Sequence, residues 1–139
     1  MTQDLRTWPY QEVLAIQEKL QREKTQKIQR PHDYILLETG FGPSGLPHIG
    51  TFSEVARTSW IQQAFQEQTG LPTKLFAFSD DMDGMRGIPD NVPNVAMLKE
   101  HLGKPLCDVP DPFEEHESFS AHMNAKLCQF LDSFGFSYE

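Results

Sequence analysis

A glycine- and proline-rich stretch, GFGPSGLPHIGTF at residues 40–52, holds the residues of this sequence best suited to bind a phosphate. Glycine carries no Cβ, so the backbone of such a loop can approach a ligand closely. His48 stands just before an expected helix, whose first N–H groups attract anions. The histidine can donate to a phosphate oxygen, and Gly50 leaves room for a base or a ribose. The stretch predicts an anion cradle, with a histidine that merely caps the helix as the alternative.

The stretch is not one of the two most common nucleotide-binding motifs. No GK[ST] follows it, which excludes a Walker loop. GFGPSG also lacks the GxGxxG register and the acidic ribose partner about twenty residues further on. Dinucleotide binding is therefore disfavoured.

The elements around this stretch predict an α/β fold. Residues 34–40 (YILLETG) form a nearly continuous apolar run, typical of a strand buried on both faces. Residues 49–68 have the length and composition of a helix, and residues 73–79 (TKLFAFS) read as a second strand. Strand, helix and strand within about fifty residues predict a βαβ unit with parallel strands. The cradle would lie at the carboxyl edge of the sheet, where such folds bind ligands.

Two amphipathic helices and one short helical candidate are expected outside this unit. Residues 12–30 place Val13, Ile16 and Leu20 on one face, which predicts an amphipathic helix at the edge of the domain. Between residues 82 and 113 the chain is rich in Gly, Pro, Asp and Asn, with one short helical candidate at 95–102. Residues 117–134 predict a second amphipathic helix, whose apolar stripe is assigned to the core: Phe119, Met123, Leu127, Phe130 and Phe134.

Composition limits the function classes. The chain has 139 residues, 38% of them hydrophobic, which suffices for one domain with a core. A formal net charge of -8 argues against a broad basic face for nucleic acid. No apolar run is long enough for a membrane span, and the two cysteines show no CxxC spacing, so a cytoplasmic protein without membrane contact is expected.

The metal-binding side chains are not arranged as in a common zinc motif. They are scattered over the second half of the chain, and only two histidines, six residues apart, flank a helix start: His101, Cys107, His116, His122 and Cys128. The spacing therefore does not support zinc, and no metal site is predicted.

Longer strings identify a family. PSGLPHIGTF, between a buried strand and a helix, resembles the HIGH motif of class I aminoacyl-tRNA synthetases. Within that class three blocks resemble the class I lysyl-tRNA synthetases: ETGFGPSGLPHIGTFSEVARTSW, FAFSDDMDGMRGIPDNVPN and HLGKPLCDVPDPFEEHESF. The resemblance runs from about residue 34 to residue 139. It implies a truncated, Rossmann-like nucleotide-binding domain with a parallel sheet, in which residues 1–33 form an N-terminal helical extension and residues 34–139 half of the catalytic domain.

The resemblance also implies an activity. Enzymes of this family activate lysine with ATP, accompanied by Mg²⁺, to lysyl-adenylate and pass the lysyl group to tRNA(Lys). The lysine-rich KMSKS loop that completes their ATP site is not found in this sequence. The chain is therefore expected to be the N-terminal portion of the catalytic domain, inactive by itself and prone to self-association through an exposed sheet edge.

Site residues follow from the matched motif. His48, Ile49 and Gly50 align with it, and Thr51 replaces its second histidine, offering a hydroxyl but no cation. The resemblance implies a catalytic role for His48 and Thr51. It implies ATP contacts for Pro43, Ser44, Gly45, His48, Ile49, Gly50 and Thr51.

A lysine pocket needs a carboxylate for the substrate ammonium and apolar walls for its methylene groups. We expect Gly40 and Gly42 to line it, with Asp80 and Asp81 as the ammonium partners. Two alternatives stay open for Asp80, Asp81 and Asp83, namely turn formation or helix capping, and a magnesium site.

Two other functions remain open. One is a free-standing, noncatalytic relative that binds ATP or an adenylate. The other is a nucleotidylyltransferase, which shares a HIG-type loop and needs no tRNA.

Overall fold

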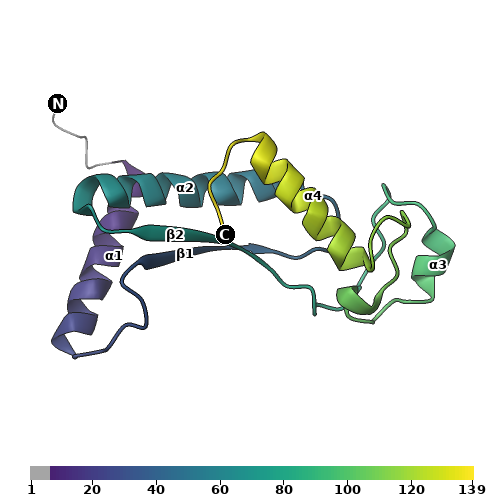
Figure 1. Cartoon of the computed structure of the whole chain (residues 1–139), viewed down its shortest axis with the longest axis horizontal. Helices are drawn as coiled ribbons and strands as arrows, with labels where there is room; N and C mark the ends of the chain where they lie inside the picture. Colours follow the sequence, from purple (N-terminus) through teal and green to yellow (C-terminus); the bar gives the residue numbers. More distant parts are fainter. Residues whose placement is uncertain (1–6) are drawn as a thin grey trace.

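The computed structural model describes residues 7–139, so residues 1–6 of the expected N-terminal extension lie outside the described part. Two parallel strands, four α-helices and one 3-10 turn follow one another along these residues (Figure 1). Their bounds are α1 Trp8–Thr25, β1 Ile35–Phe41, α2 Ile49–Thr69, β2 Thr73–Ser79, α3 Val95–Lys99, the 3-10 turn Leu106–Asp108 and α4 Phe119–Ser133.

The two strands confirm the predicted βαβ unit. β1 and β2 pair in parallel, in a register from Ile35 opposite Thr73 to Phe41 opposite Ser79, and α2 is the crossover. The free edge of β2 carries Glu139, whose N–H donates to the Leu75 carbonyl and whose carbonyl accepts from Ala77. These two bonds have the pattern of a parallel bridge. The fold is α/β with a parallel sheet, as in a truncated Rossmann-like domain.

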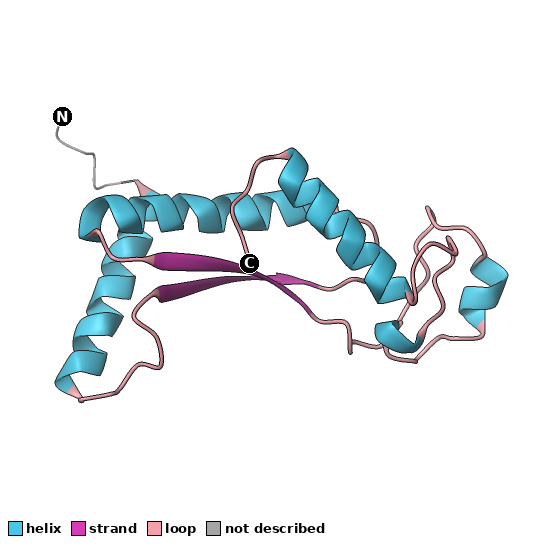
Figure 2. Ribbon diagram, in the orientation of Figure 1, coloured by secondary structure: helices cyan, strands magenta, loops and turns pink. Residues whose placement is uncertain are grey.

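Only one face of the sheet is covered, which corrects the prediction of a strand buried on both faces. Figure 2 shows α2 and α4 on the same side of the strands. Ile35 and Leu75 on that side are buried against these helices and α1. On the opposite side Leu36 is 42% exposed and Phe78 51% exposed. Within residues 7–139 no second helical layer covers these two side chains, because every helix that packs on the strands lies on the other face.

Helix α1 begins earlier and ends earlier than predicted. Pro9 sits in its first turn, where the missing N–H costs nothing, and Lys27 after its end has a positive φ of 56°. Val13 is fully buried with Ile35 and Phe65, and Ile16 and Leu20 pack against this cluster. The predicted apolar face is therefore confirmed, and it shares a core with the strands. The proposed boundary at residue 33 stays a prediction.

Helix α4 and the long loop before it form a second core. Phe119 and Met123 are fully buried there with Leu106, whereas Leu127 packs against β2. Phe134 does not belong to the core, contrary to the predicted apolar stripe, because it is 56% exposed. It caps the end of the helix and contacts Phe52 edge-on, with ring centroids 4.8 Å apart. Over residues 7–139, no helix is both long and apolar enough to cross a membrane.

Candidate functional site

The end of β1, the following loop and the start of α2 build the candidate site. His48 is the N-cap of α2, and its Nδ1 accepts the Gly50 N–H at 2.9 Å. In return the His48 backbone N–H donates to Thr51 Oγ1 at 3.3 Å. This reciprocal arrangement is a capping box, which fixes where the helix begins. An Nδ1 that accepts carries no proton, so the neutral ring holds its proton on Nε2, where it can be donated.

A cavity of about 370 Å³ opens directly at this turn. Seven of the residues predicted to bind ATP or lysine line it: Gly40, Gly42, Ser44, Gly45, His48, Gly50 and Thr51. Two predicted ATP contacts do not line it. Pro43 is buried, and Ile49 borders a neighbouring apolar pocket, which His48 also lines, with Phe52, Phe130 and Phe134. The volume falls in the range of small-ligand sites.

Glu54 lines the same cavity and was not found by sequence reasoning. It lies one helical turn after Gly50, and its Oε1 accepts the Gly40 N–H at 3.0 Å. Phe41 and Leu46 add apolar surface to the wall. The signal that could have found Glu54 is its position, because residues four apart on a helix share a face. The cavity thus combines hydrogen-bond donors, one carboxylate and an apolar wall.

The three aspartates after β2 lie apart from this lining. The Asp80 N–H donates to the Phe41 carbonyl at 3.0 Å, so its backbone runs beside β1, but its side chain is exposed. Asp81 borders another pocket with Cys107 and Ser118. Asp83 Oδ1 accepts from the Gly84 N–H and from Arg86, each at 3.0 Å. The Asp83 carboxylate thus accepts from residues that follow it closely in the chain, and the alternatives left open for the three aspartates stay predictions.

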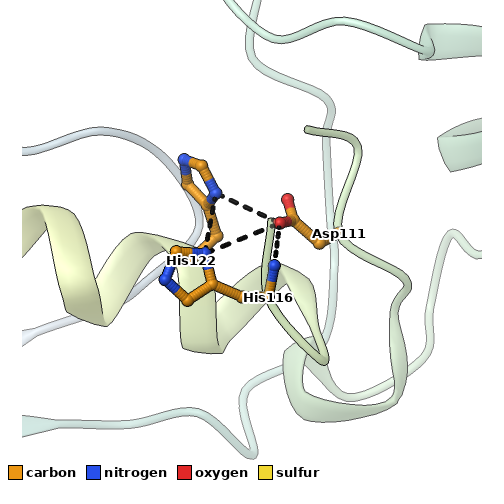
Figure 3. A group of neighbouring side chains, drawn as sticks. All are labelled: Asp111, His116 and His122. Atoms are coloured by element: carbon orange, nitrogen blue, oxygen red, sulfur yellow. Dashed lines mark hydrogen bonds and ion pairs between the residues drawn. The ribbon is translucent and has the colours of Figure 1, made fainter. Parts of the chain in front are cut away.

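A second polar cluster lies at the start of α4, where Figure 3 shows Asp111, His116 and His122 turned toward one another. One ligand atom from each residue lies within 4.8 Å of the other two. His122 Nδ1 is 3.1 Å from Asp111 Oδ2 and 3.3 Å from His116 Nδ1. Asp111 was absent from the sequence-based list of ligands, so the spacing of the histidines alone did not reveal this group.

Asp111 organises the loop before α4. Its two oxygens accept the N–H groups of Phe113, Glu115 and His116 at 3.0, 2.9 and 2.8 Å. Burial raises the pKa of the Asp111 carboxyl, but these donors and His122 outweigh burial and hold the pKa below its ordinary value. An ionised, buried carboxylate beside two imidazole rings can accept a divalent cation.

We expect the purified protein to bind about one Zn²⁺ or similar ion per chain at this cluster. Replacing His122 with Ala should weaken that binding at least tenfold, measured by competition with a chelating dye. His101→Ala is the matched control, since His101 contacts Lys104 and lies outside the cluster. Equal metal affinity in both variants would show that Asp111, His116 and His122 form only a hydrogen-bonded cluster.

Comparison with known proteins assigns the family. The family model described as tRNA synthetases class I (K) matches residues 6–139. This chain belongs to the class I (K) tRNA synthetases. The match includes the cavity, its capping histidine and the Asp111 cluster.

Several curated relatives carry the name lysine–tRNA ligase. The one from Roseobacter denitrificans is 54% identical over 134 residues, covering 96% of this chain and 24% of the relative. Those from Rickettsia typhi and Rickettsia prowazekii are 51% and 50% identical over 132 residues, each covering 95% of this chain and 24% of the relative. The chain thus spans about a quarter of the length of the curated relatives that it matches.

Proposed function

We propose that the protein carrying this chain is a lysine–tRNA ligase, and that residues 40–54 form part of its site for lysine and ATP. In the reaction, the lysine carboxylate attacks the α-phosphorus of ATP and pyrophosphate leaves. The lysyl group of the resulting adenylate then passes to the terminal adenosine of tRNA(Lys). This chemistry needs positioned substrates and neutralised phosphate charge, and no protein nucleophile.

The observation that carries the proposal is the cavity at the start of α2. The helix N-terminus and the Nε2–H of His48 supply donors for phosphate oxygens at one place. Because the loop glycines have no side chain, their backbone atoms can line the wall of the same cavity. ATP phosphates would therefore meet Ser44, Gly45 and His48, with the adenosine against the first turn of α2.

Glu54 gives the cavity a place for the lysine side chain. Its Oε1 is held by the Gly40 N–H, which leaves Oε2 to accept from an ammonium group. Phe41 and Leu46 provide apolar surface for the methylene groups. We therefore propose Glu54 as the ammonium partner. Asp80 and Asp81 stay the sequence-based candidates for that role.

The remaining partners are proposed with the reaction. Mg²⁺ would accompany ATP, tRNA(Lys) would be the acceptor, and the protein would act in the cytoplasm. Exposed Leu36 and Phe78 on the open face of the sheet favour self-association when this chain is isolated.

Pyrophosphate exchange by the complete protein tests the proposal. Exchange of labelled pyrophosphate into ATP should depend on lysine and should be far slower with other amino acids, such as arginine and norleucine. Exchange that depends on another class of carboxylate or nucleotide would favour a nucleotidylyltransferase. ATP binding without any exchange would favour the noncatalytic relative.

A further inference from the structure

We propose that Thr51 and Gly50 are positioning residues that act through His48, by fixing its backbone, ring orientation and tautomer. The inference rests on the proposed function, in which His48 serves the phosphates. It differs from a direct ATP contact for Thr51 and Gly50, which the motif alone suggests. The distinction matters because a positioning residue loses its importance once the residue that it positions is removed.

Thr51 holds the backbone of His48. Its Oγ1 accepts the His48 N–H at 3.3 Å, one turn into the helix. His48 has an extended backbone, with φ -143° and ψ -174°, and is the point at which the loop turns into α2. Without the Thr51 hydroxyl, this N–H loses its partner in the helix, and the His48 backbone is held through its carbonyl, which accepts the Phe52 N–H at 3.1 Å. Thr51 therefore determines the direction from which the imidazole reaches the cavity.

Gly50 holds the ring in two ways. Its N–H donates to His48 Nδ1 at 2.9 Å, which selects the tautomer with the proton on Nε2. Its missing side chain also provides the space in which the ring lies. A Cβ at position 50 would be 2.7 Å from His48 Cε1 and 3.0 Å from Nδ1, too close for the ring to stay in place. The observed position of the His48 ring thus depends on glycine at position 50, before any ligand is bound.

Double-mutant cycles in the complete protein separate positioning from direct contact. Thr51→Val should lower lysine-dependent pyrophosphate exchange by about ten- to a hundredfold, mainly through kcat, since small misplacements of a catalytic group cost that much. Thr51→Ser, which keeps the hydroxyl, should retain most of the activity. In a His48→Ala background, Thr51→Val should change the remaining rate by less than about twofold. Gly50→Ala should likewise lose its effect in that background, because the ring with which its Cβ collides is gone.

Additive effects would overturn the inference. If Thr51→Val or Gly50→Ala slows exchange equally with and without the His48 ring, each residue contacts ATP directly. A raised KM for ATP in the His48→Ala, Gly50→Ala double variant, relative to His48→Ala, would show that Gly50 makes room for the nucleotide.

A second measurement does not depend on activity. The ¹⁵N shifts of the His48 ring, identified by comparison with His48→Ala, should report protonation at Nε2 in the free protein and a mixture of tautomers in Gly50→Ala. A tautomer mixture in the wild-type protein would contradict the positioning role even if the exchange assay succeeds. A failed exchange assay with the expected shifts would instead count against the proposed function and leave the positioning of His48 supported.

Discussion

His48→Ala is expected to lower lysine-dependent pyrophosphate exchange by roughly tens to thousands of fold, the scale of losing one preorganised donor to a developing charge. The reason is the tautomer set by the cap. The Gly50 N–H occupies Nδ1, so the ring offers its Nε2–H at the helix N-terminus, where phosphate oxygens would gather. Alanine removes this donor without filling the cavity. Steady-state exchange at saturating lysine and ATP measures the loss.

The same substitution also removes a helix cap, and the two effects need separate controls. Losing an N-cap costs about 1 kcal/mol of stability, which does not unfold a domain of ordinary stability. His48→Ser keeps a good capping oxygen, but its short side chain cannot place a donor where the imidazole Nε2–H lies. This variant should therefore restore the melting temperature and not the activity. His101→Ala controls for loss of a histidine elsewhere. Wild-type exchange in His48→Ala, or its recovery in His48→Ser, would remove the ring from catalysis.

The sequence predicted the site's framework because its signals are local. β2 was predicted at its observed bounds, and α2 within one residue, since His48 and Gly70 mark its two ends. Gly70 adopts the left-handed conformation, with φ 66°, that ends a helix. Helix α1 starts four residues before the predicted residue 12, because Pro9 fits the first turn of a helix. The ends of a helix can thus be predicted closely from the sequence where strong capping residues mark them.

Other features depend on packing, which a single sequence does not display. The apolar run of β1 is the same whether one face or both are covered, so the exposure of Leu36 could not be derived from it. Phe134 continues a helical stripe, yet it lies just past the last turn of α4 and faces outward. An apolar periodicity indicates which residues share a face, and tertiary neighbours decide whether that face is buried.

Among the polar residues, too, some positions follow from local sequence and others depend on how the chain folds back. Asp111 joins two histidines through a loop that returns to the start of α4, a closure that residue spacing does not encode. Its place between two prolines, in VPDPF, does not by itself assign a role to Asp111. Glu54 is different, because it lies one turn after Gly50 and helical geometry alone puts it beside the loop. The role proposed for Glu54 rests on the cavity, which the sequence does not show.

Glu54→Gln is expected to raise the KM for lysine by about ten- to a hundredfold, the usual worth of a hydrogen bond to a charged group. The KM for ATP should move little, since the phosphates would bind at the other part of the cavity. Glutamine keeps the volume of the side chain and an oxygen that can still accept the Gly40 N–H, so the wall of the cavity should keep its shape. What it loses is the negative charge that would face the substrate ammonium.

Asp80→Asn and Asp81→Asn, measured in the same assay, decide between the carboxylates. Neither side chain lines the cavity, so both variants should leave the KM for lysine within about twofold of the wild type if Glu54 is the partner.

Norleucine, which lacks the side-chain ammonium, tests whether Glu54 recognises that group. Glu54→Gln should reduce the preference for lysine over norleucine, because only lysine has lost an interaction. A lysine KM that rises in Asp80→Asn or Asp81→Asn and stays unchanged in Glu54→Gln would assign the ammonium to the aspartates after β2. Equal, small changes in the KM values of both substrates in all three variants would show that none of these carboxylates binds lysine.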